Sequence, residues 1–259
     1  KKFRCKAGRW GIANSPLILN DKLCIIDIGR IVAFDAKTGK VQWQTRTDYG
    51  VAYSSAIPMT LPDGKQVLLT LPASGLVVLD AKTGTPLGSL AWKTKYDVNA
   101  AMPLIVGPNR VFIGSGYNRG GAVLEIAATG KVKKVWENTS LSTHFSNAVY
   151  RDGYIYGLAG NTGTRNPLVC LDAKTGKTMW SKSGLGSGGL IACGTNLLVI
   201  GNTGTVTLVE ISPKAYTAKQ TLKVFSTKPC WTSPCVAEKM GFFRDNPKSG
   251  STLACYEIK

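Results

Sequence analysis

The chain has 259 residues, of which 44% are hydrophobic and 18% are charged, and its formal net charge is +17. Its apolar runs, such as Val67–Leu71, are too short to cross a bilayer, so the sequence predicts one globular body without a transmembrane segment. The positive charge favours acidic partners, including anionic polysaccharide, but its scattered distribution and the lack of a nucleic-acid-binding motif disfavour nucleic acid. The first residues are Lys1 and Lys2 rather than Met, so we expect a processed or excised piece.

Four copies of a six-residue turn recur along the chain. The clear copies are Asp35–Lys40, Asp80–Thr85 and Asp172–Lys177, and a decayed copy is Ile126–Lys131. Their glycines are 45, 46 and 46 residues apart. A constant period of this size indicates a repeat architecture.

One period predicts four short strands, here Asn147–Tyr150, Tyr154–Leu158, Leu168–Leu171 and Lys177–Ser181. The fold class is therefore an all-β propeller of four-stranded antiparallel blades. In chain order, the predicted blades are 10–50, 51–98, 99–141, 142–185, 186–227 and 228–259, the last completed by 1–9. The expected third strands are Ile31–Asp35, Leu76–Asp80, Val123–Ala127, Leu168–Asp172, Val206–Ile211 and Leu253–Glu257.

The sixth blade stops before a fourth strand. Lys2–Lys6 is predicted to supply it, because ring closure removes unpaired sheet edges, and Cys5 and Cys255 then share a blade. The alternative is that the chain is part of a larger ring of seven or eight blades.

Each position of the repeated turn has a structural reason. The Asp side chain accepts backbone hydrogen bonds, and the Gly supplies a positive φ. The following Trp is expected on the outer strand, covering the neighbouring blade. These residues are Trp43, Trp92, Trp136 and Trp180. In the fifth blade the turn is replaced by Ser212–Tyr216.

The sequence contains seven cysteines, an odd number. Those among apolar strand residues are expected to be small buried hydrophobic groups: Cys24, Cys170, Cys193 and Cys255. Cys230 and Cys235 form the one close pair, for which a disulfide stays open. Their spacing lacks the second cysteine pair of a zinc ribbon, which disfavours a metal site.

Val32–Trp43 and Leu168–Trp180 resemble the repeat of pyrroloquinoline-quinone-type (PQQ-like) β-propellers, which are similar to WD repeats in architecture. Ala91–Pro103, Ser115–Gly121 and Val135–Asn138 resemble the group of outer-membrane assembly factors called BamB-like. That resemblance implies a non-enzymatic scaffold for protein–protein interaction in the periplasm or another extracytoplasmic compartment of the bacterial cell envelope. It also implies a barrel-assembly protein partner.

The family name suggests a quinone cofactor, but the residues disfavour one. Quinoprotein dehydrogenases similar to this repeat hold the quinone beside adjacent cysteines and a calcium ion. The sequence has no adjacent Cys-Cys pair and no acidic cluster suited to calcium. We therefore expect neither PQQ nor calcium, and a quinone-dependent dehydrogenase is the least favoured function.

The loops that enter the innermost strands converge at one mouth of a propeller channel. Here they carry aromatic and hydrogen-bonding side chains, namely Trp10, Asn14, Tyr53, Asp97, Asn99, His144 and Trp231. Such a ring suits a glycan, a small polar ligand or a peptide, which gives the alternative function of a ligand-binding module. The other interpretation is a mouth sealed by these side chains and water.

No catalytic residue is predicted. His144 is the single histidine and has no expected Ser or Cys partner, so it is interpreted as structural. Asp97 and Asn99 are expected to cap their loop, because one carboxylate lacks the partner that hydrolytic chemistry requires.

Overall fold

The structure is a computed structural model that describes residues 7–258. Within that range, regular structure consists of β-strands and one 3₁₀ turn, η1 (Lys95–Asp97). The chain divides into two compact units. The first comprises the residues up to Ser115 together with Ala122–Glu137, and the second comprises Gly116–Gly121 together with the residues from Asn138 onward.

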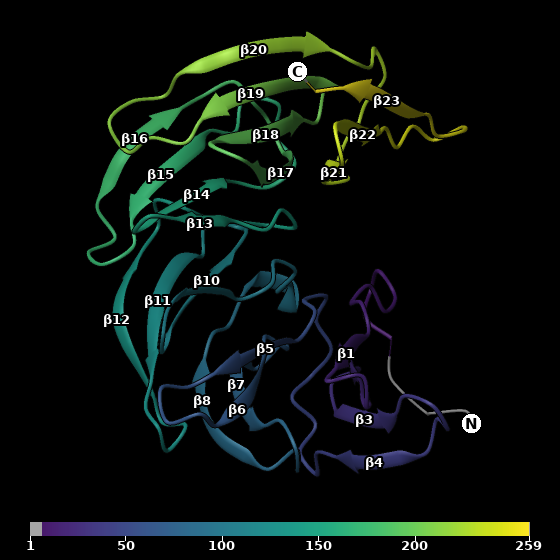
Figure 1. The fold of residues 1–259 in the computed structure, drawn as a ribbon, viewed down its shortest axis with the longest axis vertical. Coiled ribbons are helices and arrows are strands. Elements are labelled where there is room, and N and C mark those ends of the chain that lie inside the picture. The colour runs from purple at the N-terminus through teal and green to yellow at the C-terminus, as the bar shows by residue number, and fades with distance from the viewer. Residues whose placement is uncertain (1–6, 259) are drawn as a thin grey trace. The chain divides into compact units, whose positions relative to one another are not determined.

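The first three sheets have four strands each, joined in sequence order, so every strand lies beside the one that precedes it (Figure 1). The first sheet, blade 1, contains β1 (Leu17–Leu19), β2 (Leu23–Asp27), β3 (Ile31–Asp35) and β4 (Val41–Gln44). Blade 2 contains β5 (Ile57–Thr60), β6 (Gln66–Thr70), β7 (Gly75–Asp80) and β8 (Pro86–Ala91). Blade 3 contains β9 (Leu104–Gly107), β10 (Arg110–Ser115), β11 (Gly120–Ile126) and β12 (Val132–Asn138).

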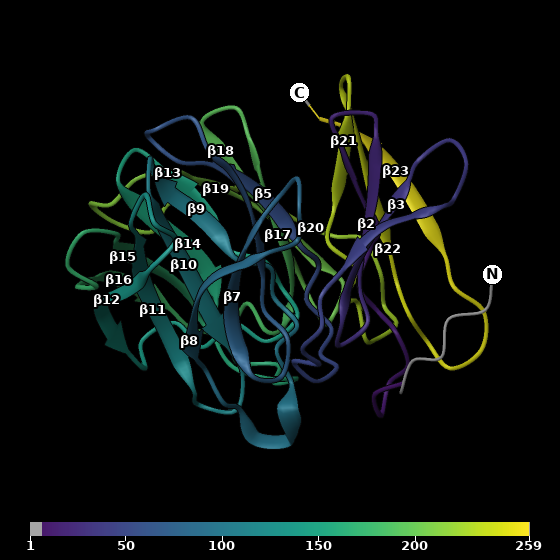
Figure 2. The ribbon, with the colours of Figure 1, turned by 90° about the horizontal axis from the view of Figure 1, so that it is seen from below.

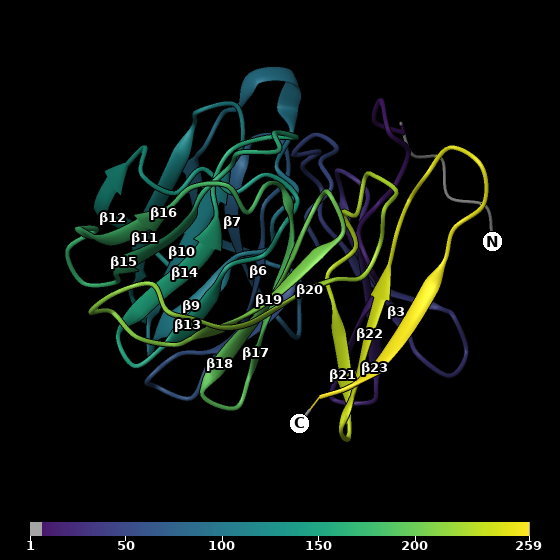
Figure 3. The ribbon, with the colours of Figure 1, turned by 90° about the horizontal axis from the view of Figure 1, so that it is seen from above.

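The remaining three sheets belong to the second unit. Blade 4 contains β13 (Val149–Arg151), β14 (Tyr154–Leu158), β15 (Leu168–Asp172) and β16 (Thr178–Lys182). Blade 5 contains β17 (Gly188–Cys193), β18 (Asn196–Gly201), β19 (Thr205–Glu210) and β20 (Ala218–Lys223), with β20 on the outer side of β19 (Figure 3). The described part of blade 6 has three strands, β21 (Cys235–Ala237), β22 (Met240–Arg244) and β23 (Leu253–Glu257), with β23 at its edge (Figure 2).

These sheets confirm the all-β prediction and its six blades. The expected third strands Ile31–Asp35, Leu168–Asp172 and Leu253–Glu257 coincide with β3, β15 and β23. The predicted closing strand Lys2–Lys6, with Cys5, lies outside the described residues.

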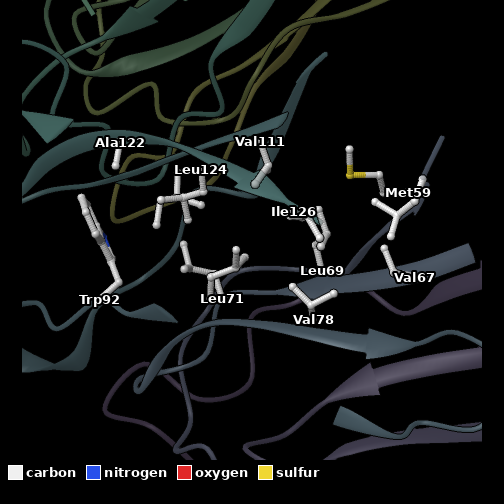
Figure 4. Packing of buried hydrophobic residues seen from close by; sticks show 13 residues of the cluster. Met59, Val67, Leu69, Leu71, Val78, Trp92, Val111, Ala122, Leu124 and Ile126 are labelled. Carbon is white, nitrogen blue, oxygen red and sulfur yellow. The ribbon is translucent and has the colours of Figure 1, made fainter. Parts of the chain in front are cut away.

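Apolar side chains from adjacent blades meet to form the core of each unit. In the first unit, Leu69 and Leu71 of blade 2 and Leu124 of blade 3 are fully buried. Figure 4 shows the side chains of the two sheets pointing toward one another. Full burial of each such side chain contributes about 1.5–3 kcal/mol to folding. Blade-to-blade packing is therefore a main source of stability.

The repeated turn has the expected hydrogen bonds. The Asp35 carboxylate accepts from the backbone N–H of Thr38 at 2.7 Å and from the Thr38 hydroxyl at 2.7 Å. Asp80 and Asp172 bind their own turns in the same way. Gly39 has φ of 65°. The turn is thus a self-contained local structure that can recur wherever its sequence recurs.

The prediction for the tryptophans is wrong for Trp92. Trp43 lies opposite Ala33 and Trp180 opposite Cys170, so these two occupy the same place on the outer strand. In blade 2 this place is taken by Gly88, opposite Val78. A side chain at Gly88 would collide with the backbone of Gly130 in blade 3.

Trp92 instead lies just beyond β8 and is fully buried. Its indole N–H donates to Ser115 Oγ at 2.9 Å. Trp92 therefore belongs to the interior between blades 2 and 3 and does not cover the outside of a neighbouring blade.

The prediction that four cysteines are buried holds only for Cys170. Cys24 and Cys193 are half-buried, and Cys255 is exposed because β23 is an edge strand. Cys230 is buried and Cys235 exposed, and both are free thiols, so the structure contains no disulfide between them.

Candidate functional site

The seven candidate residues fall into two groups, one in each unit. Five belong to the first unit, namely Trp10, Asn14, Tyr53, Asp97 and Asn99. His144 and Trp231 belong to the second.

Exposed Trp10 and half-buried Tyr53 form an aromatic pair. Their ring centroids are 5.6 Å apart at an interplanar angle of 70°, an edge-to-face arrangement. The Arg9 guanidinium lies 5.2 Å from the centroid of the Trp10 ring. Gly8 makes this approach feasible, because a Cβ there would lie 2.7 Å from Tyr53 Oη. The pair presents Trp10, 54% exposed, as a fixed apolar surface.

Asn99 is buried, and its side chain serves the fold. Its Nδ2 donates to Pro72 O at 2.9 Å, and its Oδ1 accepts from the Ser115 hydroxyl at 2.7 Å. Its backbone carbonyl accepts the N–H groups of Tyr53 and Ser54, each at 2.9 Å. Asn99 thus positions the Tyr53 loop, and its side-chain amide already forms hydrogen bonds within the fold.

Asn14 is tied to the backbone of Asp27, a residue whose carboxyl group is buried. Its Nδ2 donates to the backbone oxygen of Asp27, whose side chain is 5% exposed. Burial raises the pKa of Asp27 to about 7, and the nearby charge of Asp48 adds to this effect, whereas a hydrogen bond from the Gly29 N–H opposes it. The Asp27 carboxyl group therefore titrates near neutral pH although it is buried.

Asp97 is exposed at the end of η1. Its φ is 56°, and its backbone N–H donates to Thr94 O at 3.3 Å. The loop around it also exposes Tyr96, with the Lys95 ammonium 5.1 Å from its ring centroid. Asp97 is consequently part of a tight surface turn.

In the second unit, aromatic rings form a row from Tyr117 to Trp231. The centroids of Tyr117 and His144 are 5.1 Å apart, those of His144 and Phe145 are 5.2 Å apart, and those of Phe145 and Trp231 are 5.5 Å apart. Burial lowers the pKa of His144, which favours its neutral form. Trp231 ends the row and is 41% exposed. The row therefore leads from a half-buried imidazole to an exposed indole.

A small cavity lies beside His144, between the loops of blades 4 and 5. It has a volume of about 10 Å³ and is lined by residues that include Asn161, Asn166 and Ser187. Such a space holds at most one water molecule. This cavity is therefore too small for a sugar or a cofactor.

Within residues 7–258, no group of three or more His, Cys, Asp or Glu side chains is placed to hold a metal ion. No two cysteines are adjacent in the sequence.

Two members of the aromatic row, Tyr117 and Phe145, were absent from the sequence-based candidates. Phe145 follows His144 directly, so its loop position was a usable signal. Tyr117 lies in the turn between β10 and β11 and has φ of 57°, and its backbone N–H donates to Asn161 Oδ1 at 2.6 Å. That long-range contact could not be inferred from local sequence.

A family model described as outer membrane protein assembly factor BamB matches residues 6–182. The chain belongs to this BamB family. The match covers blades 1 to 4, where the repeated turn and the two register-matched tryptophans lie. No curated protein matches the sequence.

Solved structures share the fold. BamB from Moraxella catarrhalis is 18% identical with a TM-score of 0.66, covering 96% of this chain and 70% of that chain. The computationally designed Ika8 protein is 14% identical with a TM-score of 0.66, covering 97% and 72%. The Cps50 (Swd1) β-propeller domain from Myceliophteria thermophila is 13% identical with a TM-score of 0.62, covering 95% and 83%. The fold is therefore a β-propeller.

Proposed function

We propose that this BamB-family chain is a non-enzymatic β-propeller scaffold that binds a protein partner in the bacterial cell envelope, outside the cytoplasm. The observation that carries the proposal is the family match over residues 6–182. No helix within residues 7–258 is long and apolar enough to span a bilayer. The name of the family points to outer-membrane assembly as the process in which the partner takes part.

Two exposed tryptophans are suited to partner contact. Trp10 is held by Tyr53, and Trp231 is held by Phe145, so both indoles are fixed before binding. Tryptophan and tyrosine are enriched among the residues that dominate binding energy in protein interfaces, and rings that are already ordered lose little entropy on association.

The partner should present an acidic face. A net charge of +17 accelerates encounter with a negatively charged surface, and salt weakens the attraction. The same positive charge also attracts anionic polysaccharide. Binding of the purified partner over a series of salt concentrations would separate this nonspecific attraction from specific binding.

The test is partner capture by the wild-type chain and by the variants Trp10→Ala and Trp231→Ala, with cross-linking in native envelope preparations. We expect at least one variant to lose about thirtyfold or more in affinity for a defined partner, because a truncated interface tryptophan costs about 2 kcal/mol or more. Met179→Ala, which removes a 38% exposed side chain from β16, is the control. Equal recovery by all four proteins, or no defined partner, would contradict the proposal.

A glycan-binding module is the second candidate, favoured by the same exposed indole faces. Aromatic faces stack on sugar rings in open sites that need no enclosed cavity. A glycan array with the wild-type chain and the two Trp variants separates the functions. Signal that disappears in a variant would support this candidate, and a blank array would remove it.

A further inference from the structure

Trp43 and Trp180 occupy the same register position in blades 1 and 4, but different groups lie over them. Each pairs with the third strand of its blade just before a β-bulge, opposite Ala33 and Cys170 respectively. Both side chains are half-buried. The two sites therefore allow a comparison within one molecule.

Over Trp180, the chain supplies its own occupant. The indole N–H donates to the backbone oxygen of Ser212 at 2.8 Å, and the Tyr216 ring lies edge-on with its centroid at 5.9 Å. The Lys182 ammonium lies 5.7 Å from the centroid of the Tyr216 ring. A peptide carbonyl, a tyrosine and a lysine thus complete this site.

The occupant comes from a longer turn in blade 5. There the bond that closes the turn joins the N–H of Glu210 to the oxygen of Thr217, seven residues later. In blade 2 the equivalent bond joins Asp80 to Thr85, five residues later. The shorter turn instead places Gly84 against the Trp43 ring.

Beside Trp43, an open groove lies between blades 1 and 2. Its volume is about 820 Å³, and Trp43, Lys22, Lys65 and Lys82 are among its lining residues. The Trp43 indole N–H is shielded from solvent and has no acceptor among residues 7–258. A buried donor without a partner costs about 1–3 kcal/mol, so a ligand carbonyl that displaces the side chains covering this N–H removes that cost.

Among the charged groups that line the groove, lysine ammonium groups are available to a ligand, whereas the carboxylates are hydrogen-bonded within the protein. Asp35 and Asp80 also line it, but hydrogen bonds within their own turns occupy these carboxylates. The Thr38 hydroxyl lowers the pKa of Asp35. For Asp80, burial acts to raise the pKa, but the bonds from Thr83 outweigh it and the net shift is downward. Lys22 and Lys82 are exposed at the rim, in position to act as Lys182 does on Tyr216.

We propose that the groove beside Trp43 binds an extended segment of a partner protein that carries a tyrosine, with a backbone carbonyl accepting from the Trp43 indole. The tyrosine ring packs edge-on against Trp43, and the rim lysines contact its face. The segment reproduces what Ser212–Tyr216 does over Trp180. The inference deepens the proposed scaffold function by giving the site and the chemistry of one contact.

The probe is a synthetic peptide with the sequence of residues 209–218, which contains this segment. Binding to the full ¹⁵N-labelled chain is followed by the indole N–H signals in NMR spectra. We expect the Trp43 signal to move downfield with saturation at millimolar peptide, because the affinity of so short a segment is about 1 mM or somewhat tighter. The Trp180 signal should stay in place, because its site is already filled.

Two matched changes test the contacts. Trp43→Phe in the protein and Tyr216→Ala in the peptide should each weaken binding by about fivefold or more, whereas Trp180→Phe in the protein should not. An unmoved Trp43 signal, or equal binding of the two peptides, would overturn the groove proposal. Neither result affects partner capture through Trp10 and Trp231. The groove proposal can therefore be contradicted while the proposed scaffold function still holds, and the reverse is also true.

Discussion

Gly84 serves two blades at once. Within blade 2 it ends the repeated turn with φ of 69°. Against blade 1 it forms the surface on which the Trp43 ring lies, since a Cβ at this position would approach the ring to 2.3 Å. Gly84 and Trp43 are therefore linked across blades 1 and 2, a relation that local turn chemistry does not express.

The two roles can be separated by substitution. Gly84→Ala should lower the free energy of unfolding by about 2–4 kcal/mol, because strain at positive φ adds to overpacking against Trp43. Gly39→Ala is the control, because its φ is 65° and no atom lies within 4 Å of the added Cβ. It should cost about 1 kcal/mol. Equal losses in urea unfolding would contradict the packing role.

Asp27 makes stability depend on pH. Its pKa in the folded protein is about 7, raised from 3.8, so the folded state binds a proton more tightly than the unfolded chain. The stability from this proton is complete below pH 4 and is lost as pH rises toward 7. Asp27→Asn should flatten this part of the profile.

Urea midpoints between pH 4 and pH 8 provide the measurement for Asp27. Asp48→Asn, which removes the neighbouring charge, should move the loss of stability to lower pH. A wild-type profile that is unchanged by Asp27→Asn would show that the carboxyl group stays ionised when buried.

At the scale of the element, turn length decides what covers the outer strand. The turn of blade 5 extends far enough to place Ser212 and Tyr216 over Trp180, whereas that of blade 2 places Gly84 against the Trp43 ring and leaves a groove beside it. Two strands with the same register thus differ in their surroundings, because the difference arises in the following blade.

This difference predicts unequal effects of the same substitution. Trp180→Phe should lower the free energy of unfolding by about 1–3 kcal/mol more than Trp43→Phe, because it leaves the Ser212 carbonyl without its donor. Trp43→Phe removes a donor that has no acceptor within the described residues. Chemical denaturation of the two variants compares them directly, and equal losses would mean that the bond to Ser212 contributes nothing.

At the scale of the whole molecule, β23 is an exposed edge strand in the described part of blade 6. Among residues 7–258 it pairs only with β22, and it exposes Leu253 at 69% and Tyr256 at 40%. The outer strands β16 and β20 carry lysines, which oppose edge-to-edge pairing, but β23 carries none. An apolar edge of this kind is a site for strand addition.

Leu253→Lys should reduce self-association, because a charge on the edge must lose water when another strand pairs with it. Sedimentation velocity over a series of protein concentrations measures the effect. Met179→Lys, on a blade with its four strands complete, should leave association unchanged. If Leu253→Lys associates as the wild type does, the β23 edge is not the contact.

Much of the architecture could be predicted because its determinants are local. The Asp, Thr and Gly of each turn bind one another, so Asp35 and Asp172 mark the ends of β3 and β15 in sequence and in structure alike. The roles of the candidate loop residues were harder to predict from the sequence. Trp10 and Trp231 are exposed, as a binding role requires. The side chain of Asn99, however, forms hydrogen bonds with Pro72 and Ser115 that no local pattern encodes.

The sequence by itself determined the repeat, the strands, the turns and the resemblance to BamB. The tertiary structure decided which repeated positions are filled by the chain and which stay open. Trp92 leaves the outer strand for the interior, and Trp43 lies beside a groove while Trp180 lies under Tyr216. The physical reason is that the repeated turns close through hydrogen bonds within six residues. The surroundings of an outer strand, in contrast, are supplied by the next blade, some forty-five residues away.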